Sequence, residues 1–377
     1  MPMSLRIWAY GWSGTASGGS TRFALCWACF EVSTAVLAGA LAVRDALHDD
    51  AAVGFRQVHN HAPQETPRLT IAIPTFRRRA LLLEAIRSAA SQRNAGLFEI
   101  LIVDNDPVSD HWAWLVEAAP ELLNLPIRYV VNDENLGMLG NWNRCITMAR
   151  GEWLTILNDD DLLDPDFVAT MFVLLQRTGA DGLVCGKRML DERDNILPTR
   201  RETALRAVRS TITAAWFRAR QTRRITARQM FWGNPVGNPV GFLSRTAQFR
   251  ELGGFDPQEY PSADYFLFTR FALRFQLCQA RCVLASIRIA ENESMRKDVI
   301  YGFLQTEHRI QQSLAGTALP RWRKFISPWL IGYHVERIER MWQIVLDPAL
   351  VRQRIGASYR PGYHLWLQAL RVLLGGF

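Results

Sequence analysis

Between residues 69 and 185 the chain alternates short apolar runs with segments of helical spacing. Four runs have the length of buried β-strands, and they are Leu69–Pro74, Glu99–Asp104, Ile127–Val131 and Trp153–Leu157. Helical spacing follows in Ala80–Ala90, in Gly140–Ala149 and from Pro165 to about Thr178. Leu183–Cys185 is a candidate fifth strand. Strands that alternate with helices indicate βαβ units, so we predict an α/β fold around a mostly parallel, buried sheet.

Polar residues follow each of the four strands. The four ends are Pro74-Thr75, Asp104–Asp106, Asn132–Asn135 and Asn158–Asp161. Asp and Asn are common in turns, which is the alternative explanation for any one of these ends. Ligands of open α/β sheets bind beyond the carboxyl ends of the strands. Four polar ends in succession therefore favour a ligand site at this edge of the sheet.

The densest acidic cluster of the chain is Asn158, Asp159, Asp160 and Asp161. Neighbouring carboxylates repel one another, so a site that keeps them together favours a cation. Oxygen ligands select Mg²⁺ or Mn²⁺, which complete their coordination with phosphate oxygens and water. A nucleoside diphosphate would supply such phosphates. Neither glycine-rich phosphate motif, G-x-G-x-x-G or G-x-x-x-x-G-K-[ST], is present, which counts against dinucleotide oxidoreductases and phosphate-loop NTPases.

In order and spacing, several stretches resemble the family-2 glycosyltransferases of the GT-A fold. They are TIAIPTFRR (70–78), EILIVDND (99–106), NLGMLGNWNRCITMARGEWLTILNDDDLLDPDF (135–167), LGGFD (252–256) and SADYFLFTR (262–270). The resemblance implies a GT-A type, Rossmann-like and mostly parallel sheet flanked by helices. It also implies inverting transfer of a sugar from a nucleoside-diphosphate sugar, usually a UDP-sugar, to an acceptor hydroxyl. The expected setting is bacterial-type synthesis of cell-surface polysaccharide or glycolipid.

The resemblance also implies roles for individual residues. Asp160 falls on the metal ligand of the D-x-D motif and would hold Mg²⁺ or Mn²⁺, and Asp264 falls on the general base. The implied donor-nucleotide contacts are Pro74, Thr75, Phe76, Asp104, Asn143, Asn158 and Asp159. Expected in the sugar and acceptor pocket are Asp161, Gly254 and two asparagines of the repeated GNPVGNPVG (233–241), Asn234 and Asn238. The chain departs from the family at Asn158, Ala263 and Ala290, where relatives often carry Asp, Glu and His.

Three regions are expected. Residues 1–66 form an N-terminal extension, either poorly ordered or a weak membrane anchor through the apolar Phe23–Val43. Residues 67–295 form the GT-A domain, with a nucleotide-binding half (67–161) and an acceptor half (162–295). Residues 296–377 form a helical extension, in which the apolar face of Ile331, Val335, Ile338 and Trp342 either packs on the domain or meets a membrane. The six cysteines are expected as reduced thiols, with a zinc site at Cys26, Cys29, Cys278 and Cys282 as the alternative.

The charge balance is basic, with a net charge of +8. Lys187–Arg228 holds 12 Lys or Arg and 4 Asp or Glu, which fits either a solvated helical face or an anionic partner. The expected acceptor is a saccharide or a lipid-linked saccharide, and no nucleic-acid motif is visible. We expect a cytoplasmic protein with peripheral contact to the anionic inner face of the cytoplasmic membrane. Two other functions remain open: a sugar-nucleotide nucleotidyltransferase, and a non-catalytic sugar-nucleotide-binding protein.

Overall fold

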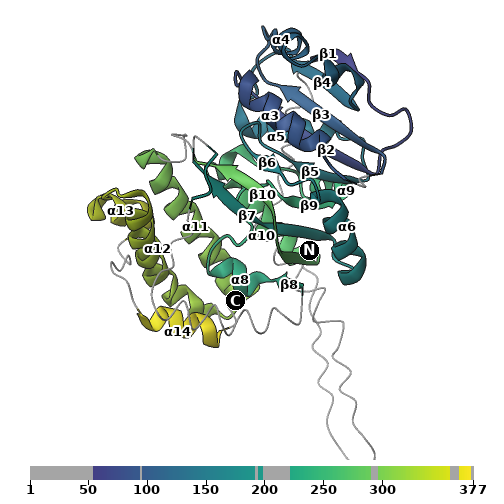
Figure 1. Ribbon diagram of the computed structural model, residues 1–377. Coiled ribbons are helices and arrows are strands. Elements are labelled where there is room, and N and C mark those ends of the chain that lie inside the picture. Colours follow the sequence, from purple (N-terminus) through teal and green to yellow (C-terminus); the bar gives the residue numbers. More distant parts are fainter. Residues whose placement is uncertain are drawn as a thin grey trace, which may run out of the picture.

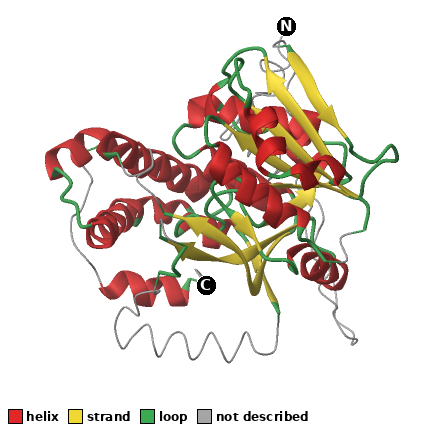
Figure 2. Cartoon of the chain, turned by 45° about the horizontal axis from the view of Figure 1, so that its top comes forward, coloured by secondary structure: helices red, strands yellow, loops and turns green. Residues whose placement is uncertain are grey.

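The computed structural model of the chain describes residues 54–93, 96–191, 194–197, 221–289, 296–356 and 365–374. A twisted sheet runs through the molecule with helices on both faces, and the last helices form a separate layer at one side (Figure 1). Figure 2 shows the same arrangement after a turn of the molecule. In the described part of the chain, no helix has both the length and the apolar character that a membrane span requires.

Ten strands form one mixed sheet in the order β1-β4-β3-β2-β5-β9-β7-β10-β6, with β8 paired to β10. The four predicted strands are its parallel centre: β4 (Ile127–Asn132), β3 (Phe98–Asp104), β2 (Leu69–Thr75) and β5 (Trp153–Ile156). The second half of the sheet has parallel β7 (Gly182–Leu190) and β10 (Leu277–Arg288), joined to β5 through antiparallel β9 (Phe242–Arg245). The remaining strands are β1 (Phe55–Asn60), β6 (Leu162–Leu163) and β8 (Thr222–Ile225). The predicted α/β class with a largely parallel centre is confirmed.

Helices cover both faces of the sheet. One face packs against α3 (Arg79–Ala90), α4 (His111–Ala118) and α6 (Phe167–Thr178), and the other against α5 (Gly137–Met148), α9 (Thr246–Glu251) and α10 (Ala263–Arg274). The alternation of strand side chains produces this division. In β2, Ile71 and Ile73 belong to the first core, whereas Ala72 belongs to the second. Because the centre of the sheet is buried on both sides, its central strands β2 and β3 are largely apolar.

Strand β1 corrects the predicted boundary of the N-terminal extension. Its residues Phe55–Asn60 lie within the segment 1–66, yet they pair antiparallel with β4 at the edge of the sheet. The side chain of Arg56 also donates hydrogen bonds to the carbonyl oxygens of Pro107 and Ser109. The domain therefore begins by residue 55. The expected anchor segment Phe23–Val43 and the pair Cys26 and Cys29 lie outside the described residues.

The C-terminal layer consists of α11 (Lys297–Thr317), α12 (Ser327–Trp342), α13 (Pro348–Ile355) and α14 (Leu365–Leu373), with the 3-10 helix η4 (Arg321–Phe325) before α12. The helical extension is therefore confirmed. Ile331 and Val335 of α12 are buried in a cluster with Ile300 and Leu304 of α11, and the side chain of Trp342 is outside the described set. The predicted apolar face thus packs against the protein, and its interpretation as a membrane-binding face is wrong.

Candidate functional site

The polar ends of the central strands meet at one edge of the sheet. The hydroxyl of Thr75, the last residue of β2, donates to Asp159 Oδ2 at 2.8 Å, and the Phe76 amide approaches the same oxygen at 3.4 Å. The Asn105 amide donates to the Thr75 carbonyl at 2.9 Å, and Asn132 Nδ2 donates to Asn105 Oδ1 at 3.0 Å. Residues that follow four different strands therefore form one connected network, with Pro74 buried in β2 beneath it.

Asp104 lies at the floor of this network and is fully buried. Its Oδ2 accepts hydrogen bonds from the hydroxyls of Tyr129, at 2.6 Å, and Ser109, and its Oδ1 accepts the Asp106 amide at 3.1 Å. Burial, followed by the Asp104 charge, raises the pKa of Tyr129, so the phenol keeps its proton and remains a donor. In this arrangement both Asp104 oxygens already have protein partners. A nucleobase contact would have to share or displace one of them.

Three carboxylates stand together after β5. Burial raises the pKa of Asp159 to about 6 despite the hydrogen bond from Thr75, and the Asp160 charge adds to the rise. Burial and then the Asp160 charge also raise the pKa of Asp161, which accepts hydrogen bonds from Asn158 Nδ2 at 2.9 Å and the Arg288 amide at 3.0 Å. Two acids with raised pKa values beside a third carboxylate form a site that a cation would stabilise.

Arg78 supplies positive charge at this cluster. Its Nη1 lies 2.8 Å from Asp160 Oδ2 and 3.5 Å from Asp159 Oδ1. The preceding residue Arg77 has a left-handed backbone with φ 58°, which is unusual for a residue with a side chain. The turn at Arg77 ends β2 and directs the next residue toward the carboxylates. Arg77 itself pairs with Asp106 at 2.7 Å, and this hydrogen bond lowers the pKa of Asp106.

The donors present fit a divalent cation that shares its coordination with phosphate. Asp160 is the most exposed carboxylate of the cluster, at 18% of its side chain against 8% for Asp159. The carbonyl oxygen Oδ1 of Asn158 is buried and has no hydrogen-bond partner in the described structure. Within the described ranges no group of three or more His, Cys, Asp or Glu side chains is arranged around a common metal position. Such an ion would therefore depend on diphosphate oxygens for most of its ligands.

Lys187 joins the acidic cluster to the repeated loop 233–241. Its Nζ donates to the carbonyl oxygens of Val236 at 2.8 Å and Asn238 at 2.6 Å, and to Asn238 Oδ1 at 2.8 Å. Burial lowers the pKa of Lys187 to about 8, while the charges of Asp161 and Asp264 act in the opposite direction. Lys187 is thus a half-buried cation whose charge acts on both Asp161 and the expected base Asp264.

The two asparagines of the loop have structural partners. Asn234 Oδ1 accepts hydrogen bonds from the backbone amides of Val236 at 3.1 Å and Gly237 at 3.0 Å. The Asn234 side chain therefore stabilises the turn in which it lies. Asn238 binds Lys187 through Oδ1 and approaches Asp161 Oδ2 through Nδ2 at 3.4 Å. The loop backbone is therefore fixed beside the cluster. Both side chains, which we predicted as sugar contacts, are engaged in holding it there.

Asp264 lies in the first turn of α10, where the helix dipole favours a negative charge. The side chain is partly exposed, and its Oδ1 accepts the Tyr265 amide at 2.7 Å. Burial raises the pKa of Asp264 to about 6, against the lowering effects of that amide and of Lys187. A carboxylate with a pKa near 6 and some solvent access has the properties of a general base that works near neutral pH.

Two other predicted residues are braces between elements. Asn143 of α5 is fully buried, and its amide group exchanges hydrogen bonds of 2.9 and 2.8 Å with the backbone carbonyl and amide of Phe255. The carbonyl of Gly254 accepts a hydrogen bond from Arg270 at 3.2 Å, and its φ is 68°. Asn143 thus braces α5 against Phe255, and its predicted contact with the donor nucleotide stays a prediction.

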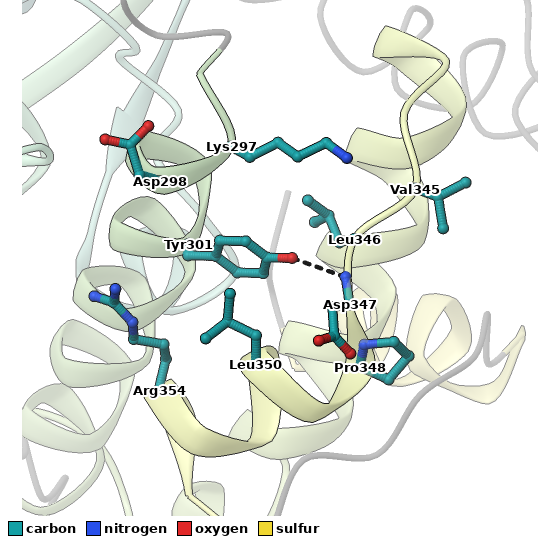
Figure 3. A pocket seen from close by; sticks show the side chains of 9 residues that line it. All are labelled: Lys297, Asp298, Tyr301, Val345, Leu346, Asp347, Pro348, Leu350 and Arg354. Carbon is teal, nitrogen blue, oxygen red and sulfur yellow. Dashed lines mark hydrogen bonds between the residues drawn. The ribbon is translucent and has the colours of Figure 1, made fainter.

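A separate pocket of about 720 Å³ lies between α11 and α13 (Figure 3). Its wall includes Tyr301, whose hydroxyl accepts a hydrogen bond from the Asp347 amide at 2.7 Å, and the apolar Leu346 and Leu350. Lys297 and Arg354 lie at its rim. None of the predicted site residues lines this pocket.

The described cysteines, Cys145, Cys185, Cys278 and Cys282, are free thiols.

Comparison with known proteins gives the family. The model of "Glycosyl transferase family 2" matches residues 70–253. Residues 70–253 belong to glycosyl transferase family 2. This range contains the carboxylate cluster, Lys187 and the 233–241 loop, and it ends before Asp264. The predicted family is confirmed for these residues.

Curated relatives match parts of the chain. The putative colanic acid biosynthesis glycosyl transferase WcaA of Escherichia coli is 33% identical over 103 residues, 27% of this chain and 36% of that protein. The GalNAc(5)-diNAcBac-PP-undecaprenol beta-1,3-glucosyltransferase of Campylobacter jejuni is 32% identical over 106 residues, 28% of this chain and 33% of that protein. The chain thus spans about a third of the length of these relatives.

Among solved structures, TarS residues 1–349 of S. aureus in complex with UDP is 14% identical, with a TM-score of 0.49, and the match covers 78% of this chain and 89% of that one.

The sequence analysis predicted no site role for two side chains of this family-2 domain, Arg78 and Lys187. Arg78 is the last residue of the stretch TIAIPTFRR (70–78) and the second of three consecutive arginines, Arg77 to Arg79. Three positive charges are more than a turn needs, and this excess was the available signal. Lys187 stands at the start of the basic segment that we predicted as a solvated face or a site for anionic partners. The structure half-buries it beside the 233–241 loop, and residues 198–220 of the same segment lie outside the described residues.

Proposed function

We propose that the chain transfers a glycosyl group from a UDP-sugar to an acceptor hydroxyl with inversion at the anomeric carbon. The observation that carries this proposal is the network of Thr75, Asp159 and Asp160 at the strand ends. The charge of Lys187 acts on both Asp161 and Asp264. The strand-end network is suited to a diphosphate, and the Asp264 carboxylate is suited to proton abstraction. Membership in glycosyl transferase family 2 supports the same reaction class.

The donor side of the proposal assigns the nucleotide to the ends of β2 and β3. Thr75 and the Phe76 amide hold Asp159 in place for the ribose and diphosphate. Asp160 would hold Mg²⁺ or Mn²⁺, which when bound acts as a Lewis acid on the departing diphosphate. Arg78 Nη1 lies 2.8 Å from Asp160 Oδ2. Its long side chain can turn from this carboxylate to the diphosphate when the donor binds.

The acceptor side assigns proton transfer to Asp264. The acceptor oxygen attacks the anomeric carbon from the face opposite the diphosphate, so the new bond forms as the old one breaks and the configuration inverts. Asp264 takes the hydroxyl proton during this attack. Lys187 fixes the 233–241 loop and keeps a positive charge near the base. The Campylobacter relative is named for action on an undecaprenol-linked acceptor, which supports a saccharide or lipid-linked saccharide as acceptor.

The deciding experiment is a screen of nucleotide sugars by thermal shift with Mn²⁺, followed by product analysis with the best donor. Release of UDP with a glycosylated product of inverted configuration is the expected result. Asp264→Asn should bind that donor normally and release UDP about 10²–10⁴-fold more slowly. Formation of a sugar nucleotide with release of pyrophosphate would instead identify a nucleotidyltransferase. Tight UDP binding with no turnover by any donor would identify a binding protein.

A further inference from the structure

The C-terminal helical layer has an unusual charge distribution. Residues 308–335 and 348–377 contain no Asp or Glu, although residues 296–377 as a whole hold twelve Lys or Arg. The acidic side chains of this region lie on α11, on α12 and before α13. Segments that keep only basic charge over such lengths favour an anionic partner.

The 3-10 helix η4, with the sequence RWRKF, exposes aromatic rings between basic side chains. Phe325 is 81% exposed and Trp322 is 44% exposed. Arg321 and Lys324 point into solvent beside them, whereas Arg323 is buried with its guanidinium over the ring of Phe231. Arg323 therefore attaches η4 to the protein and leaves the two rings outward.

Helix α14 presents a second apolar stripe. Its exposed side chains Trp366, Ala369 and Leu373 recur at spacings of three and four residues, and Leu373 is 80% exposed. The opposite side, with Leu367 and Leu370, packs on the core of the domain. The outer side of α14 therefore exposes apolar side chains to solvent.

The two elements are neighbours. Arg323 of η4 donates to the Leu374 carbonyl just after α14 at 3.4 Å, and Trp366 packs edge-on against Trp329 at 5.7 Å between ring centres. We call the exposed residues of both elements the η4–α14 surface: Arg321, Trp322, Lys324, Phe325, Trp366, Ala369 and Leu373. In Figure 1, α14 lies at the end of the molecule away from α4 and β1.

We propose that the η4–α14 surface binds the surface of an anionic lipid bilayer. Aromatic rings are favoured at the level of the headgroups, and lysine and arginine beside them are attracted by acidic lipids. A second copy of the chain is a poorer partner, because two acid-free surfaces would bring like charges together. The commitment to a membrane rests on this combination of exposed rings with unopposed basic charge.

The position of the surface relates it to the acceptor side of the candidate site. Arg323 lies over Phe231, the last residue of α8 (Ala227–Phe231), two residues before the 233–241 loop begins. A chain bound through η4 would therefore hold this loop toward the bilayer. The membrane proposal itself does not depend on the proposed transferase activity, because vesicle binding needs no donor or acceptor.

The test is co-sedimentation of the full chain with vesicles of phosphatidylglycerol and phosphatidylcholine, and with vesicles of phosphatidylcholine alone, at low and high salt. We expect binding that needs phosphatidylglycerol and weakens with salt. The double variant Phe325→Ser with Leu373→Ser should bind roughly tenfold more weakly. Both side chains are at least 80% exposed, so the fold should be retained. Val108→Ser removes a side chain that is also 80% exposed, before α4, and should bind as wild type does.

A local measurement separates this surface from any other membrane contact of the chain. Hydrogen–deuterium exchange should slow in peptides covering η4 and α14 when phosphatidylglycerol vesicles are added, and should not change in peptides covering α4. Unchanged exchange in η4 and α14, or equal vesicle binding by the double variant and wild type, would overturn the proposal. A dimer in light scattering that the double variant converts to a monomer would assign the surface to a second copy instead.

Discussion

The side-chain nitrogen of Lys187 lies 2.6 Å from the carbonyl oxygen of Asn238, and the same nitrogen also binds the Asn238 side chain at 2.8 Å. This contact fixes the 233–241 loop at a point where Asn238 Nδ2 is also 3.4 Å from Asp161. A single half-buried cation therefore fixes the loop beside the acidic cluster. The electrostatic effect of Lys187 on Asp264 extends the link to the expected base.

Lys187→Met should reduce kcat more than it weakens donor binding. Methionine fills a similar volume but leaves the carbonyl oxygens of Val236 and Asn238 without their donor, and each unsatisfied buried group costs about 1–3 kcal/mol. The loop should loosen while the nucleotide end of the site, at Thr75 and Asp159, stays intact. We expect a fall in kcat of roughly tenfold or more, since 1.4 kcal/mol corresponds to a factor of ten.

The measurement is kcat with the donor found in the screen, together with the donor Kd by calorimetry and the Tm. Arg188→Met is the matched control, because Arg188 is the next residue and pairs with Asp164 away from the loop. A variant at Lys187 with wild-type kcat and a normal Tm would show that the loop does not depend on this contact.

Asp160→Ala should remove the dependence of UDP binding on a divalent ion. The wild-type chain should lose affinity for UDP by roughly tenfold or more in excess chelator, because the ion offsets the charge of the diphosphate and about 1.4 kcal/mol corresponds to a factor of ten. The variant should bind UDP weakly with Mn²⁺ and with chelator alike. Calorimetry in both buffers gives the two affinities. Asp166→Ala is the control, because Asp166 lies in the same stretch with its side chain 57% exposed. Equal wild-type affinity with and without Mn²⁺ contradicts the assignment of Asp160.

The N-terminal boundary gives a stability prediction. A chain that starts at Gly54 keeps β1 and should retain the Tm of the full chain. A chain that starts at Gln64 loses the pairing of β1 with β4 and the hydrogen bonds of Arg56 to Pro107 and Ser109. Its Tm should fall by about 2–4 °C for each kcal/mol lost. Thermal unfolding of both chains makes the comparison, and equal Tm values would mean that β1 contributes nothing to the stability of the sheet.

The sequence predicted those parts of the molecule that depend on local pattern. The apolar run of β2 and its polar end identified Thr75, and parallel neighbours must end at the same edge, so the meeting of Thr75 with Asp159 followed. By contrast, β1 reads FRQVHN and is almost entirely exposed. It joins the sheet through backbone hydrogen bonds at an edge, for which no apolar alternation is needed.

Long-range contacts account for the other differences. Asn143 stands in a motif that implies a nucleotide contact, and the structure adds a bracing contact with the backbone of Phe255, 112 residues later in the chain. Lys187 stands in a basic segment, and its partial burial results from β7 pairing with β9 and β10 beside the 233–241 loop. Neither contact leaves a periodic signal in the local sequence, because both partners are set by the order of strands in the sheet.

The pKa of Asp264 gives a prediction for the pH dependence of the reaction. Only the ionised carboxylate can accept the proton of the acceptor, and burial raises its pKa to about 6 from the ordinary value of 3.8. The rate kcat should therefore be constant above about pH 7 and fall tenfold per pH unit well below pH 6. Asp264→Asn should abolish this fall together with most of the rate.

The Tm supplies an independent check, since the folded state binds the Asp264 proton more tightly than the unfolded state does. Its contribution to stability is present below about pH 4 and is lost as pH rises through 6. Asparagine removes that loss, so Asp264→Asn should raise the Tm at pH 8 and change it little at pH 4. A kcat that stays constant from pH 8 to pH 5 while chemistry is rate-limiting would exclude Asp264 as the base, and Asp256 would be tested next.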